Sequence, residues 1–153
     1  MNLDGLFAPF DPRLTNLVDR LRYWAANQGE QFAFGFTSDG EAEIRMPYGQ
    51  LETRAKALAA HLVEAGMRGE RALLLYPPGL DFVTAFFGCF FAGMVAVPAY
   101  PPRRNRNLGR IQAISDDAEA RIVLSVSEVT DRAQGLLDEA PHLQSLTWLA
   151  TDG

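Results

Sequence analysis

The stretch FFAGMVAVPAYPPRRNRNLGRIQAI, residues 90–114, decides the fold of this chain. It begins at the end of a very apolar segment, and it continues through a short β-branched run, a proline corner and a loop rich in arginine. A new helical pattern follows the loop. The order of helix, strand, stiff loop and helix is typical of a crossover unit in a parallel sheet. Because open α/β sheets bind ligands at the carboxyl ends of their strands, the loop is a candidate site.

The same alternation continues on both sides of this stretch. Apolar residues recur at three- and four-residue steps in the helical segments, and short continuous apolar runs indicate strands that are covered on both faces. We therefore expect an α/β fold with a mainly parallel sheet and crossover helices. The expected helices are residues 14–28, 47–65, 80–92, 108–118 and 127–140, the expected strands are 72–76, 95–97, 122–126 and 146–149, and a hairpin is expected from 32–37 and 43–46.

Several single residues predict where these helices begin and end. Pro47 is expected at the first position of its helix, where the missing N–H is tolerated. Asn107 is a candidate N-cap of the helix that follows the arginine loop, and Ser125 or Ser127 could cap the last helix. Pro141 is expected to end that last helix.

Residues 82–100 carry no charge and match the ~20 residues that span a bilayer. Gly88, Gly93 and Pro98 interrupt this segment, and residues 95–97 have strand character. A helix, a glycine stop and a buried strand explain the whole segment, so we expect no transmembrane segment.

Composition narrows the possible functions. The chain has 153 residues, 48% of them apolar and 22% charged, which suits one soluble domain with a core. Its formal net charge of −5 argues against a dedicated nucleic-acid binder. Cys89 is the only cysteine, so no internal disulfide can form, and the start of the chain does not resemble a signal peptide. We expect a cytoplasmic location and no nucleic-acid partner.

Most residue types that carry chemistry have a structural interpretation here. His61 and His142 lack acidic or cysteine partners at a recognisable spacing, and we expect His142 in a surface loop. Cys89 lies among phenylalanines, which predicts a buried thiol with a raised pKa. An acidic cluster, Asp116, Asp117 and Glu119, is interpreted as a solvated face.

The arginine loop is the one cluster with a functional alternative to a solvated loop. Arginine recognises phosphate and carboxylate groups, and the helix that begins after the loop attracts anions at its N-terminus. The loop arginines are Arg103, Arg104 and Arg106, with Arg110 just beyond them. No GxxxxGK[ST] or GxGxxG motif occurs, so the chain shows no phosphate-binding glycine loop.

Three segments resemble fatty acyl-AMP ligases, the long-chain branch of the acyl-adenylate-forming superfamily. Tyr48-Gly49-Gln50-Leu51 is similar to an early "Tyr-x-x-Leu" helix of these enzymes, although Pro47 stands where the family often has Ser or Thr. Residues 80–100 resemble the second core motif. The ending Ala99-Tyr100-Pro101-Pro102, followed by arginines and asparagines, resembles the fatty acyl-AMP ligase branch most specifically.

The resemblance implies a two-step reaction in the full-length parent. A fatty acid and Mg-ATP give an acyl-adenylate, and the acyl group then passes to an acyl carrier protein in polyketide, lipopeptide or lipid biosynthesis. The family's phosphate loop and catalytic lysine have no counterpart here, and Lys56 is not that lysine. Residues 1–153 are therefore expected to be the N-terminal portion of the large domain, inactive alone, without catalytic, cofactor-binding or metal residues. Candidates for the carrier-protein side are Tyr100, Arg103, Arg104 and Arg106.

Two kinds of alternative remain open. One is a fragment of an acyl-CoA synthetase or of an amino-acid adenylation domain. The other is a non-catalytic module that binds acyl groups or proteins on the same scaffold. A Ser/Thr/Gly-rich loop with a lysine in the following stretch of the gene would favour an enzyme.

Overall fold

The structure is a computed structural model, and it describes residues 13, 15–38, 43–102, 108–135 and 137–153. Several predicted features lie outside these residues: the first residue of the first helix, the tip of the hairpin, the Asn107 cap and the loop arginines Arg103, Arg104 and Arg106.

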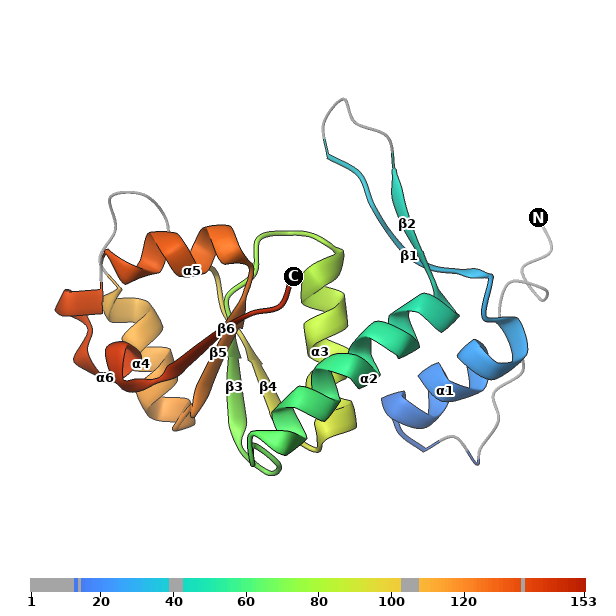
Figure 1. Cartoon of the computed structure of the whole chain (residues 1–153), viewed down its shortest axis with the longest axis horizontal. Coiled ribbons are helices and arrows are strands. Elements are labelled where there is room, and N and C mark those ends of the chain that lie inside the picture. The colour runs from blue at the N-terminus through green and yellow to red at the C-terminus, as the bar shows by residue number, and fades with distance from the viewer. Residues whose placement is uncertain (1–12, 14, 39–42, 103–107, 136) are drawn as a thin grey trace.

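Four parallel strands form the central sheet in the order β4-β3-β5-β6 (Figure 1). Ala72 of β3 pairs with Ala96 on one side and with Ile122 on the other, so β3 lies inside the sheet. This arrangement confirms the predicted α/β class with a mainly parallel sheet. The strands are β3 (Arg71–Leu74), β4 (Val95–Pro98), β5 (Ile122–Ser125) and β6 (Thr147–Ala150).

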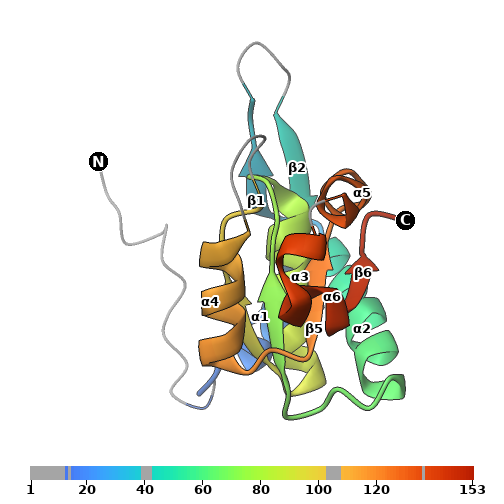
Figure 2. The ribbon, with the colours of Figure 1, turned by 90° about the vertical axis from the view of Figure 1, so that its left-hand side faces the viewer.

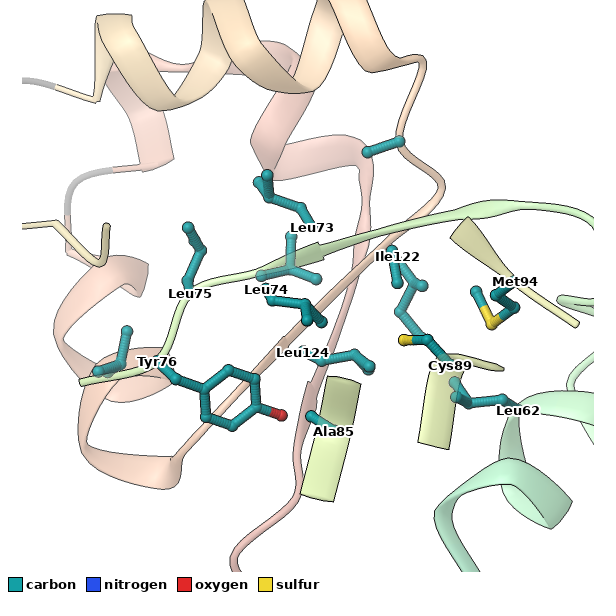
Figure 3. Packing of buried hydrophobic residues seen from close by; sticks show 14 of the residues in the cluster. Leu62, Leu73, Leu74, Leu75, Tyr76, Ala85, Cys89, Met94, Ile122 and Leu124 are labelled. Atoms are coloured by element: carbon teal, nitrogen blue, oxygen red, sulfur yellow. The ribbon is translucent and has the colours of Figure 1, made fainter. Parts of the chain in front are cut away.

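Helices cover both faces of this sheet. One face carries α2 (Tyr48–Glu64) and α3 (Leu80–Ala92), and the other carries α4 (Gly109–Ala118), α5 (Ser127–Gln134) and α6 (Pro141–Ser145), as Figures 1 and 2 agree. Strands β3 and β5 are buried between the two layers, and this explains their continuous apolar runs. Figure 3 shows part of the resulting core, including Leu73, Leu74 and Leu124.

The apolar segment 82–100 folds as the sequence predicts. Helix α3 ends at Gly93, whose φ of 72° is the left-handed conformation that favours glycine. The Gly93 N–H bonds the Phe90 carbonyl, the Met94 N–H bonds the Cys89 carbonyl, and the chain then enters β4. None of the helices in the described part of the chain has both the length and the apolar character needed to cross a membrane.

Helix α1 (Leu17–Gln28) and an antiparallel hairpin of β1 (Phe32–Phe36) and β2 (Ile44–Pro47) lie beyond α2, and the hairpin projects away from the sheet (Figure 1). They share a second apolar cluster, built around Leu21, Met46 and Leu51. The hairpin itself was predicted. Pro47, however, is the N-cap of α2 and the last residue of β2, while the helix proper begins at Tyr48.

The prediction of one helix over residues 127–140 is wrong. Helix α5 ends at Gln134, a 3₁₀ turn η1 follows at Leu137–Glu139, and Pro141 begins the short helix α6 instead of ending a longer one. Proline suits a first helical position because the N–H that it lacks would have no partner there. The N-cap of α5 is Val126, so neither Ser125 nor Ser127 caps the helix with its side chain.

Candidate functional site

The carboxyl edge of the sheet contains a topological switch point between β3 and β5. From β3 the chain moves outward to β4, and it then returns across the sheet to β5 and continues to β6. The helices that follow β3 and β5 leave toward opposite faces (Figure 1). Open α/β sheets bind ligands in the crevice outside such a point, so this edge is the candidate functional site.

A network of polar groups joins the strand ends at this edge. The Ser125 hydroxyl donates to the Leu75 carbonyl, and the two hydroxyl oxygens of Tyr76 and Thr151 are 2.7 Å apart. The Thr151 N–H donates to the Ser125 carbonyl at 2.9 Å. Residues at or just beyond the ends of three different strands are thereby bound to each other, at the edge where a ligand is expected.

Tyr76 is buried, with 6% of its surface exposed. Its ring packs edge-on against Phe82, the two centroids being 6.4 Å apart. Burial raises the pKa of the Tyr76 hydroxyl far above its usual range, while the bond to Thr151 acts in the opposite direction. The hydroxyl is therefore neutral at physiological pH and can either donate or accept in its bond with Thr151.

Asp152, which follows β6, ties the end of that strand to the start of α5. Its Oδ1 accepts hydrogen bonds from the Ser127 N–H at 2.9 Å and from the Ser127 hydroxyl at 2.8 Å. Ser127 is the first residue of α5, so a carboxylate that follows β6 satisfies an N–H at a helix N-terminus. The bond with the Ser127 hydroxyl, together with the backbone N–H bonds, lowers the pKa of Asp152.

Of the residues that the sequence singled out for this edge, the structure describes Tyr100 and Arg110. Tyr100 follows β4 and is 75% exposed. Strand β4 is the outermost strand on its side, so Tyr100 lies beside the switch point and not within it. Arg110 is exposed in the first turn of α4, and the other loop arginines lie outside the described residues.

Sequence reasoning missed Tyr76, Thr151 and Asp152. A signal was present, since each follows a strand at its carboxyl end. The signal was incomplete because Tyr76 and Thr151 are 75 positions apart, and no local pattern shows that they meet.

Cys89, the acidic cluster and His142 lie away from this edge, and their surroundings explain each of them. Cys89 is fully buried, and desolvation raises the pKa of its thiol to about 12, which confirms its predicted place in the core (Figure 3). The acidic cluster around Asp116 is exposed, as predicted. The prediction of a loop position for His142 is wrong, because it is the second residue of α6 and its Nδ1 lies 3.4 Å from Asp116 Oδ1. Helix α6 packs against α4 and so brings His142 close to Asp116.

Within the described ranges, no group of three or more His, Cys, Asp or Glu side chains could hold a metal ion. The described glycines with a positive φ, Gly66, Gly69 and Gly93, precede β3 and β4 at the amino edge of the sheet, opposite the candidate site.

Comparison with known proteins gives a consistent family. Residues 21–152 match the AMP-binding enzyme family. The chain is 37% identical over 146 residues to the medium-chain-fatty-acid–[acyl-carrier-protein] ligase JamA of Moorena producens, a match that covers 92% of this chain and 25% of that protein. It is 31% identical over 129 residues to the long-chain-fatty-acid–AMP ligase FadD32 of Mycobacterium marinum, covering 82% of this chain and 20% of the relative.

A solved structure agrees with these relatives. The fatty acyl-adenylate ligase from L. pneumophila, in complex with acyl adenylate and pyrophosphate, matches with a TM-score of 0.82 and 32% identity. The match covers 95% of this chain and 25% of that one, so the chain spans about a quarter or less of the relatives it resembles. The chain belongs to the AMP-binding enzyme family, and its homologues there include the fatty acyl-AMP ligases that the sequence resembles.

Proposed function

We propose that this chain is the N-terminal portion of the large domain of a fatty acyl-AMP ligase. The parent enzyme activates a fatty acid with ATP in the presence of Mg²⁺, and it transfers the acyl group from the acyl-adenylate to an acyl carrier protein. The observation that carries this proposal is the 37% identity over 146 residues to JamA, whose name states both a fatty acid and an acyl carrier protein. The ending Ala99-Tyr100-Pro101-Pro102 after β4 supports the same branch.

The chain contributes a scaffold to this reaction. It supplies four parallel strands and the polar network at their carboxyl edge. We assign ATP binding to the rest of the parent, because the phosphate loop and the catalytic lysine of the family have no counterpart in this sequence. Pyrophosphate release from ATP with a fatty acid tests this division directly. We expect turnover by the full-length parent and none by residues 1–153 above a buffer blank.

We assign the loop after β4 to the carrier-protein side of the site. Tyr100 is exposed after β4 at the carboxyl edge of the sheet, and Arg103, Arg104 and Arg106 follow it in sequence. A carrier protein presents acidic surface and a phosphopantetheine group, so we expect these arginines to attract it. Rim charges act mainly on the association rate, and salt screens them.

The test is the double variant Arg103→Ala/Arg104→Ala in the full-length parent. Acyl transfer to the carrier protein should slow, most at low salt, while pyrophosphate release in the first step stays nearly unchanged. The matched control is Arg54→Ala/Arg68→Ala, which removes two exposed arginines on α2 and in the turn before β3. Normal transfer by the loop variant at low salt, or equal slowing by the control, would show that the loop is only a solvated corner.

A further inference from the structure

The end of β6 is held in place by groups from distant parts of the chain. Strand β6 pairs with β5 on one side only, so it is the outermost strand on its side of the sheet. The two residues after β6, Thr151 and Asp152, are nevertheless both held by hydrogen bonds to other parts of the chain. The Thr151 hydroxyl bonds the Tyr76 hydroxyl and donates to the Ser125 carbonyl at 3.3 Å, and the Thr151 N–H donates to the same carbonyl. Asp152 is bound to the first residue of α5.

Tyr76 is the rigid part of this arrangement. It follows β3, one of the two strands that flank the switch point. Its ring lies in the core beside Phe82 of α3. A buried hydroxyl needs a partner, and the Thr151 side chain supplies it. The bond therefore fixes the distance between the carboxyl ends of β3 and β6, across β5 that lies between them.

The end of β6 matters because, in the proposed function, this chain is the N-terminal portion of the parent and the next segment follows β6. The chain leaves β6 at the carboxyl edge, where open α/β sheets bind their ligands, and the relatives are about four times as long as this chain. The segment that comes after Asp152 in the parent thus begins at the ligand edge. A shift at its starting point would move any ligand-binding group that it carries.

We propose that the Tyr76 hydroxyl is a positioning group for acyl-adenylate formation, because it holds Thr151 and so fixes the point at which the parent chain leaves β6. This role rests on the proposed function of the parent. Tyr76 and Thr151 need not touch a substrate. They act together, as the two halves of one bond, through the segment whose start they hold.

The experiment measures pyrophosphate release by the full-length parent, with ATP and a fatty acid, at a temperature where every variant is fully folded. Tyr76→Phe and Thr151→Val each remove one hydroxyl and keep the shape, and each should lower kcat/KM by about tenfold, since small misplacements away from the reacting atoms are costly. The double variant should be no worse than Thr151→Val alone, because Thr151→Val already removes the hydroxyl that Tyr76 binds. Thr151→Ser keeps the hydroxyl and should retain near-normal activity.

The control is Cys89→Ala, which perturbs the same core away from the carboxyl edge. A merely structural role predicts that Tyr76→Phe behaves like this control and that both are fully active once folded. Normal kcat/KM in Tyr76→Phe and Thr151→Val, additive losses in the double variant, or a Thr151→Ser enzyme as slow as Thr151→Val would each overturn the role of Tyr76. A wild-type parent that releases no pyrophosphate with any fatty acid would overturn the proposed function, and this role with it.

Discussion

The contact between α2 and α3 at Gly88 offers a quantitative test of the packing that supports the sheet. A Cβ atom added at Gly88 would lie 2.9 Å from Leu58 Cδ2, 3.2 Å from Cγ and 3.3 Å from Cβ. Leu58 is only 9% exposed, so its side chain has little room to move away. Alanine gains about 1 kcal/mol over glycine in a helix, whereas overpacking costs about 1–3 kcal/mol. We expect Gly88→Ala to lower the free energy of unfolding by roughly 1 kcal/mol.

Urea unfolding followed by far-UV circular dichroism measures this change. Ala57→Gly, at an exposed position of α2, is the control, because it reports the cost of a helical glycine without any clash. Leu58→Ala alone should cost about 2–5 kcal/mol. In that background the new methyl group at position 88 enters vacated space, so Gly88→Ala should now stabilise by about 1 kcal/mol. Additivity of the two changes within about 0.5 kcal/mol would refute the close contact.

Three further outcomes are expected from the described contacts. Burial raises the pKa of Cys89 from 9.0 to about 12, so its thiol contributes stability that is full below pH 9 and falls between pH 9 and 12. In urea unfolding, Cys89→Ala should therefore lose less of its free energy of unfolding than wild type does over that pH range. Asp152→Asn removes a negative charge near the N-terminus of α5 and should cost about 0.3–1 kcal/mol at neutral pH. Since the Ser127 bonds lower the pKa of Asp152, the difference from wild type should vanish as the pH falls well below 3.8. Glu119 has a φ of 50°, so Glu119→Gly should be more stable than Glu119→Ala by about 1 kcal/mol in thermal unfolding, both variants having lost the ion pair with Arg71.

The buried strands were predictable because a strand that is covered on both faces has a continuous apolar sequence. The runs at 72–76 and 122–126 are apolar at every position but the fourth residue of the second run, Ser125, whose hydroxyl finds the Leu75 carbonyl. Helix α3 and its stop at Gly93 were predictable because one glycine separates the helical from the strand pattern. In these segments the local preferences agree with the final fold.

Other features depend on partners that no local pattern reveals. Apolar spacing continues across residues 127–140, so only the tertiary packing shows that α5 ends at Gln134 and that Pro141 begins a helix. The sequence placed Tyr100 after a strand, but it could not place that strand at the edge of the sheet. The bond between Tyr76 and Thr151 joins positions 75 apart, and the cap of α5 by Asp152 joins positions 25 apart.

Acyl loading of a carrier protein by the full-length parent tests the central claim most directly. The parent is incubated with ATP, Mg²⁺ and a fatty acid, together with either a phosphopantetheinylated acyl carrier protein or free coenzyme A, and the products are identified by mass. A parallel reaction replaces the fatty acid with amino acids. The account predicts an increase in carrier-protein mass equal to the fatty acyl group, with little acyl-coenzyme A. Efficient formation of acyl-coenzyme A, activation of an amino acid in place of the fatty acid, or no pyrophosphate release with any of these substrates would contradict it.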